Sequence, residues 1–201
     1  MMGKAHIAVG IASALVIAFP ENVMQFALAV AGGAIGGIAS DIDIKSNAHT
    51  KDARQSRIIA FIVAFLAIIA GCIYDTIVTL DYESAPLAEM GIGLLIVIPT
   101  AIAMRRSSHR GFSHSILAGV ICTFGLLFIN ITFALAFLAS FASHVLLDLM
   151  NKRGVRVFYP FSWKPCLGIC VADKTGNNVA LTIGFILDIF LISVFLISYF
   201  A

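Results

Sequence analysis

The sequence predicts an all-α membrane protein, a polytopic transmembrane helix bundle of about five to seven apolar helices, and three observations lead to this prediction. Hydrophobic residues make up 60% of the 201 residues, and charged residues only 12%. The mean hydropathy of +1.01 exceeds what a water-soluble core of this size could hide. The apolar residues gather into long runs. Because no low-complexity tract or linker divides the chain, we expect one integral membrane domain over residues 1–201.

The first two apolar runs, Ile7–Phe19 and Val23–Ala39, are short for helices that cross a membrane. A hydrocarbon core about 30 Å thick requires about 20 helical residues. We therefore read the pair either as a thin spanning hairpin or as a re-entrant one. A cleaved signal peptide is a weaker alternative, because no small-residue cleavage site follows at Pro20 and the second run begins at once.

Five further runs continue the pattern, so that seven helical segments are predicted. They cover Ile58–Tyr74, Met90–Met104, Phe112–Ile129, Ile131–Leu149 and Val179–Phe200. The last run contains an acid, Asp188. An intramembrane acid is a functional candidate by default, but Asp188 could equally pair with a hydroxyl group of a neighbouring helix.

The charges predict how these segments are oriented. All 13 Lys and Arg residues fall on one side of the membrane when the segments alternate in direction. Acids gather in a loop on the other side: Asp75, Asp81, Glu83 and Glu89. By the positive-inside rule the N-terminus is cytoplasmic and the C-terminus lies outside. A re-entrant first hairpin would not alter this assignment, because it returns to the side from which it started.

Residues 150–178 are predicted to form a cytoplasmic loop in the lipid headgroup layer. Aromatic residues such as Tyr159 and Trp163 alternate there with Arg153, Arg156 and other basic residues, a pattern typical of membrane interfaces. Nucleic acid is a weaker alternative, since no nucleic-acid-binding fold is visible, and we expect no such partner.

The densest polar stretch is Ser108–Ser115, which lies between two apolar runs. Two imidazoles and the guanidinium of Arg110 add no stability at the mouth of an apolar helix, so a functional site is one interpretation. The alternative is a basic loop that stops translocation, with Ser113 capping the next helix.

Other polar residues map to the same membrane plane. The predicted topology brings the ends of four helices together, and they carry His6, Asp41, Asp43, His109, His114, His144 and Asp148. Residues far apart in the sequence could therefore come within coordination distance of one another.

Each of these groups also has a simpler interpretation. His144 and Asp148 are four residues apart and share a helix face, which suits a metal site or a carboxylate that orients a ligating histidine. They could instead satisfy each other as a buried pair. Asp41 and Asp43 could both point into one pocket from an extended turn, or simply be solvated. His6 alone is more typical of an interfacial histidine.

Together these residues resemble the YdjM-like family of bacterial inner-membrane metal-dependent hydrolases. The likeness runs in the same order from His6 to Pro160, and the block from His109 to Ser115 is its most specific element. Its other elements are Asp41-x-Asp43, Ser143-His144-x3-Asp148, Gly154-Val155 and Tyr159-Pro160. The family's second segment typically ends Pro-Asp-Ile-Asp-His, whereas Ile44 stands here in place of the histidine. His6 or His49, which otherwise reads as a solvated loop residue, is the candidate replacement.

The resemblance implies a divalent metal ion and a location in the bacterial inner membrane. Mixed imidazole and carboxylate ligands suit zinc first, and manganese or iron as alternatives, with one or two ions. The expected metal ligands are His6, Asp41, Asp43, His109, His114, His144 and Asp148. The catalytic candidates are Arg110, Asp43 and His109, and the planar fork of Arg110 suits a phosphate or carboxylate of the substrate.

We therefore expect a hydrolase that cleaves a phosphoester or related bond in a lipid or lipid-linked substrate at the cytoplasmic face. The alternative from another class is a cation or proton-coupled transporter or channel that uses the same His/Asp cluster. A transport site should lie near the membrane midplane with access from both sides. A third interpretation is a scaffold with a structural metal, and the oligomeric state is left open.

Overall fold

The computed structural model describes residues 3–44, 50–78, 87–169 and 174–200. In chain order its elements are α1 (Gly3–Ala18), α2 (Val23–Ala39), the 3-10 turn η1 (Ser40–Asp43), α3 (Thr50–Val78), α4 (Leu87–Arg106), the 3-10 turn η2 (Phe112–His114), α5 (Ile116–Leu127), α6 (Ile131–Leu149) and α7 (Lys174–Phe200). Because no strand occurs in these ranges, the predicted all-α class is confirmed.

Five of the helices are long and apolar enough to cross a membrane, namely α2 with η1, α3, α4, α6 and α7. The other two, α1 and α5, contain 16 and 12 residues. The described chain thus agrees with the predicted bundle of five to seven apolar helices. Whether α1 and α2 span the membrane or re-enter it stays an open prediction.

The helix α5 begins later than the apolar run predicts. The run starts at Phe112, but Phe112 to His114 form η2, and the side chain of Ser115 accepts a hydrogen bond of 3.1 Å from the backbone amide of Ala118. Ser115 is therefore the N-cap. The alternative in which Ser113 caps this helix is wrong, because the chain turns once more before α5 starts.

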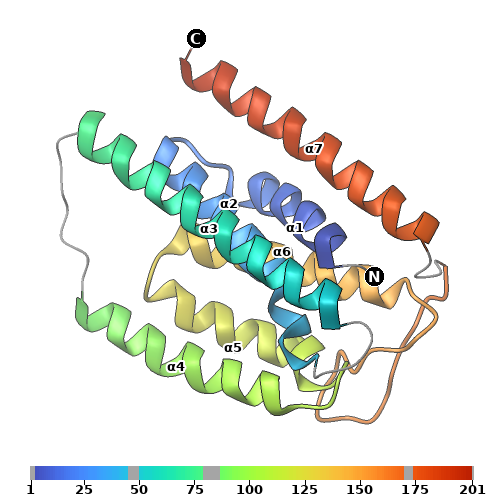
Figure 1. Ribbon diagram of the computed structural model, residues 1–201. Helices are drawn as coiled ribbons and strands as arrows, with labels where there is room; N and C mark the ends of the chain where they lie inside the picture. Colours follow the sequence, from blue (N-terminus) through green and yellow to red (C-terminus); the bar gives the residue numbers. More distant parts are fainter. Residues whose placement is uncertain (1–2, 45–49, 79–86, 170–173, 201) are drawn as a thin grey trace.

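Three helices form the centre of the bundle. About half of the apolar window is buried in α2 (56%) and in α6 (50%), against 17% in α3, α4 and α7. The centre is completed by α1, which packs against both α2 and α6, while α7 and α4 lie on opposite flanks (Figure 1). Exposed apolar side chains on the outer helices, such as Phe61 and Phe65 of α3, suit contact with lipid.

Glycines allow the central helices to approach each other closely. A Cβ atom on Gly37 would lie 2.6 Å from the carbonyl oxygen of His6, and one on Gly36 would lie 2.6 Å from that of Phe137. Both distances are too short for any side chain larger than hydrogen, so glycine is required at both positions for this packing. The approach places α1 and α6 directly against the last turns of α2.

The basic residues gather at one end of the bundle. The starts of α1, α3, α5 and α7 and the ends of α2, α4 and α6 lie together at the lower right of Figure 1. We call this the basic end. Residues 150–169 cross this end after α6 and are held there by backbone hydrogen bonds. The amide of Arg156 donates to the carbonyl oxygen of Arg110 at 3.1 Å, and the amide of Leu167 donates to that of Leu149 at 2.8 Å.

Some sequence predictions cannot be compared with the structure. His49, Lys45, Asp81 and Glu83 lie outside the described residues. The membrane orientation, the single-domain boundary and the assignment of residues 150–178 to the headgroup layer stay predictions. Phe161 and Trp163, at 71% and 64% exposed, present aromatic surface in that segment.

The orientation can be tested with two cysteines in a chain whose four native cysteines are replaced. Lys51→Cys, at the basic end, should react with a membrane-impermeant maleimide only in inside-out vesicles. Leu87→Cys, at the opposite end, should react only in intact spheroplasts, because positive charge is retained in the cytoplasm. Labelling of Lys51→Cys in spheroplasts would reverse the orientation.

Candidate metal centre

A buried histidine of α6 is held by the backbone of α2. His144 is fully buried, and its Nδ1 lies 2.6 Å from the carbonyl oxygen of Gly37. Because a carbonyl group only accepts hydrogen bonds, Nδ1 carries the proton and Nε2 carries a lone pair. This Nε2 is buried without a hydrogen-bond partner among the described residues.

A chain of three polar groups fixes a second buried histidine in the same way. The hydroxyl group of Ser113 donates a short hydrogen bond to Asp43, so its oxygen is left to accept one from His114 Nδ1 at 2.8 Å. Nδ1 of His114 is therefore protonated, and Nε2 again carries the lone pair. Nε2 of His114 is also buried and has no hydrogen-bond partner in the described chain.

The two lone pairs face carboxylate oxygens. Oδ1 of Asp41 lies 3.8 Å from Nε2 of His114 and 3.8 Å from Nε2 of His144. Oδ2 of Asp148 lies 3.4 Å from Nε2 of His114. Neither an imidazole lone pair nor a carboxylate oxygen can donate a hydrogen bond to the other, so both keep lone pairs without a donor. A cation between them would bind these lone pairs.

His6 completes the inner part of the cluster from α1. Its ring stacks on that of His144, with 3.8 Å between the ring centroids. Its Nε2 lies 3.8 Å from Oδ1 of Asp148. In two groups of three residues, the possible ligand atoms lie within 4.8 Å of one another. The groups are His6, Asp41 and His144, and His114, His144 and Asp148.

Asp43 lies on the outer side of this cluster and is saturated with donors. Its Oδ1 accepts a hydrogen bond of 2.9 Å from Nδ1 of His109, and its Oδ2 accepts bonds from Ser113 and from the backbone amide of Arg110. The bond to Asp43 raises the pKa of His109 above its ordinary value. Asp41, Asp43 and His109 form a third group with metal-ligand spacing, and the side chain of His109 is 51% exposed.

Arg110 joins the loop before η2 to the end of α6. Its guanidinium lies 3.1 Å from Oδ2 of Asp148 and donates a hydrogen bond of 2.6 Å to the carbonyl of Arg153. Its backbone adopts a φ of +60°, a left-handed conformation that is uncommon for a residue with a side chain. That turn directs the guanidinium inward while His109 stays at the surface.

The structure brings all seven predicted metal-ligand residues into one cluster at the basic end, together with Arg110. Asp41 and Asp43 reach it from a 3-10 turn rather than from the extended turn that the sequence suggested. Which of the seven bind a metal stays a prediction. The sequence does not reveal the two groups that orient the imidazoles, Ser113 and the carbonyl of Gly37, although Ser113 lies within the motif that singled out His114.

Asp188 lies apart from this cluster on α7. It is buried, and its Oδ1 has no hydrogen-bond partner among the described residues. No function follows from this observation, so its role stays open.

The comparison with known proteins agrees with the motif. Residues 1–200 match the family model described as YdjM inner membrane protein. No curated protein and no solved structure shows significant similarity to the chain. Because the matched region covers nearly the whole sequence, this chain belongs to the YdjM inner membrane protein family.

Proposed function

We propose that the protein is a membrane-bound metal-dependent hydrolase whose metal lies among His114, His144 and Asp148. The observation that carries this proposal is the pair of buried imidazole Nε2 atoms without hydrogen-bond partners in the described chain, both facing carboxylates. An unpaired buried acceptor costs about 1–3 kcal/mol of stability. Two such atoms directed at the same space are therefore better explained by a ligand than by chance.

The donor set fits a divalent transition metal. Imidazole nitrogen and carboxylate oxygen suit zinc, and also manganese or iron, whereas no thiolate is part of the three groups found in the described chain. The Gly37 carbonyl and Ser113 act on the Nδ1 atoms of the two histidines, as second-layer groups commonly do in metal sites. Asp41 and His6 are placed to complete the coordination. When bound, such an ion polarises the scissile bond and acidifies water.

The substrate-facing residues lie between the metal site and the surface. Arg110 has five N–H donors, and its pairs with Asp148 and the carbonyl of Arg153 leave others for an anionic group of the substrate. His109, which is half-exposed and held by Asp43, is placed to exchange a proton with a group that enters from solvent. Asp43 positions His109, Arg110 and Ser113 at the same time.

We propose a phosphoester or related bond of a lipid or lipid-linked molecule as the target. The cluster lies at the basic end, where anionic headgroups of the cytoplasmic leaflet would gather. A transporter site should lie near the middle of the bundle, so the position at one end favours hydrolysis over transport.

The proposed metal ligands can be tested by measuring bound metal rather than enzymatic activity. We expect His114→Ala and His144→Ala each to lose most of the bound metal while remaining monodisperse in detergent, because the apolar bundle supplies most of the stability. The measurement is metal content per chain by elemental analysis, beside size-exclusion chromatography. Asp188→Asn, a change at a buried residue of α7 apart from the cluster, serves as the control and should keep its metal. Unchanged metal content in both variants would contradict the proposed site.

A second prediction concerns Arg110 and separates hydrolysis from metal storage. Arg110→Lys keeps the charge but loses the bidentate fork, so metal content should stay close to wild type while kcat/KM falls. The loss should be about 1.5–3 kcal/mol, the scale of a charge-assisted hydrogen bond, or roughly ten- to a hundredfold in rate. The assay follows phosphate release from a panel of lipid phosphoesters.

The matched control is Arg106→Lys, because Arg106 is exposed in the last turn of α4 and lies outside the cluster. Its kcat/KM should equal that of the wild type. If the kcat/KM of Arg110→Lys also equalled that of the wild type, Arg110 would not bind the anionic group of the substrate.

A further inference from the structure

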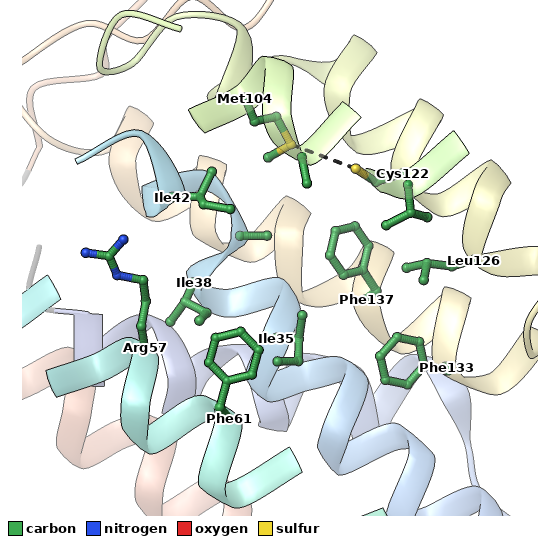
Figure 2. A pocket seen from close by; sticks show the side chains of 13 residues that line it. Ile35, Ile38, Ile42, Arg57, Phe61, Met104, Cys122, Leu126, Phe133 and Phe137 are labelled. Carbon is green, nitrogen blue, oxygen red and sulfur yellow. Dashed lines mark hydrogen bonds between the residues drawn. The ribbon is translucent and has the colours of Figure 1, made fainter. Parts of the chain in front are cut away.

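An apolar pocket lies beside the candidate metal centre, and its lining residues are not among the candidate ligands. Its volume is about 160 Å³, and its walls come from α2, α3, α4, α5 and α6. Figure 2 shows Phe61 and Ile38 on one side and Met104 and Cys122 on the other. The lining is hydrocarbon and sulfur apart from the guanidinium of Arg57, so water would gain few hydrogen bonds inside.

The pocket runs along the bundle, starting at the basic end. Arg57, Ile42 and Met104 come from the helix ends at that side, whereas Leu126 and Phe133 come from the opposite ends of α5 and α6. Figure 2 shows Arg57 and Leu126 at opposite sides of the hollow. A lipid chain that descends from the headgroup layer follows the same direction.

The pocket and the metal cluster share the turn η1. Ile42 lines the pocket, while its neighbours Asp41 and Asp43 belong to the polar cluster. A molecule whose polar part reaches the cluster would therefore bring its adjoining apolar part to the mouth of the pocket. Within η1, adjacent residues therefore face different surroundings: Ile42 faces the apolar pocket, and Asp41 and Asp43 face the polar cluster.

The size of the pocket limits what it holds. A cavity of about 150 Å³ lined by Leu, Ile and Phe is known to admit benzene, so this one accommodates roughly six carbon atoms. That is a short segment of an acyl or isoprenoid chain rather than a whole chain.

Arg57 supplies a charge at the basic end of the pocket. Its Nε donates a hydrogen bond of 3.2 Å to the carbonyl oxygen of Ala53, and within the described residues its guanidinium has no carboxylate partner. The side chain is half-buried, and Figure 2 shows its guanidinium at the edge of the hollow. A cation at the rim of an apolar pocket complements a lipid with an anionic headgroup.

We propose that this pocket binds the segment of an anionic lipid's hydrocarbon chain nearest the headgroup, while Arg57 pairs with the headgroup itself. The proposal rests on the hydrolase function above for the identity of this lipid as substrate, but lipid binding can be measured without turnover. It assigns the chain-binding site to the pocket between α2, η1, α3, α4, α5 and α6, whose lining side chains are not candidate metal ligands.

The probe is a phosphatidic acid that carries a photoreactive diazirine within the first carbons of one acyl chain. Irradiation of the purified protein in detergent should label pocket residues, identified by peptide mass spectrometry. Ala101→Leu fills the pocket and should lower this labelling roughly tenfold, since forcing extra carbon atoms into an occupied site costs about that much affinity. Ala103→Leu is the matched control, because Ala103 is exposed on the same helix and does not line the pocket.

Arg57→Gln tests the headgroup contact separately. It should reduce labelling by the phosphatidic acid probe roughly tenfold, the value of a lost charge-assisted hydrogen bond, and leave labelling by a diacylglycerol probe unchanged. Arg54→Gln, an exposed neighbour on α3, should change neither. Equal labelling of wild type, Ala101→Leu and Arg57→Gln would overturn the proposal, as would labelling confined to the outer faces of α3 and α7.

The same samples distinguish this proposal from the hydrolase proposal. Metal content should be unaffected in Ala101→Leu and Arg57→Gln, because neither residue is among the candidate ligands. Specific pocket labelling without any lipid turnover would retain the lipid site and refute the hydrolase. Lipid turnover that both variants leave unchanged, with no specific labelling, would retain the hydrolase and refute the pocket.

Discussion

The hydrogen bond between His144 and the carbonyl oxygen of Gly37 is the contact on which the centre depends, at 2.6 Å between two helices. It requires α2 and α6 to touch at backbone distance, which Gly36 permits. Gly37 allows α1 to approach α2 equally closely. Once these three helices are in place, His6 stacks on His144 and Asp148 faces both His6 and His114. A side chain at Gly37 would separate α1 from α2 and so move His6 away from its partners.

Burying this many polar groups at the end of an apolar bundle costs free energy, and most of the network offsets that cost internally. Asp43 accepts three hydrogen bonds, and Ser113 relays one of them to His114. Among the described residues, the histidine nitrogens left without a hydrogen-bond partner include Nε2 of His114, Nε2 of His144 and Nδ1 of His6. Stability is thus withheld at the atoms that would bind a cation, a pattern typical of functional sites.

Much of this arrangement could be predicted from the sequence, because apolar run length and the placement of Lys and Arg constrain a membrane protein strongly. They sufficed to predict the all-α class and to place His6, Asp41 and His144 at one end of the bundle. The sequence could not show that Gly37 orients His144, because a backbone carbonyl has no residue-type signature. The cap was misassigned for a related reason: Ser113 and Ser115 are equally good caps by propensity, and the extra 3-10 turn that selects Ser115 depends on tertiary contacts with Asp43. The pocket beside η1 was equally invisible, since it is a gap between five helices.

The turn η1 places side by side the two environments that the proposed amphiphilic substrate requires. Asp41 and Asp43 join a polar cluster, while Ile42 between them lines an apolar cavity, so the two environments meet within four residues. An ion that crosses the bundle would need polar groups along its path. The described side chains that line this pocket are hydrocarbon and sulfur, apart from Arg57 at its rim. A molecule with an anionic head and a hydrocarbon tail needs both environments side by side, and it needs them at the level where headgroups lie. The geometry of η1 is therefore consistent with the proposed chemistry on a lipid at the membrane surface.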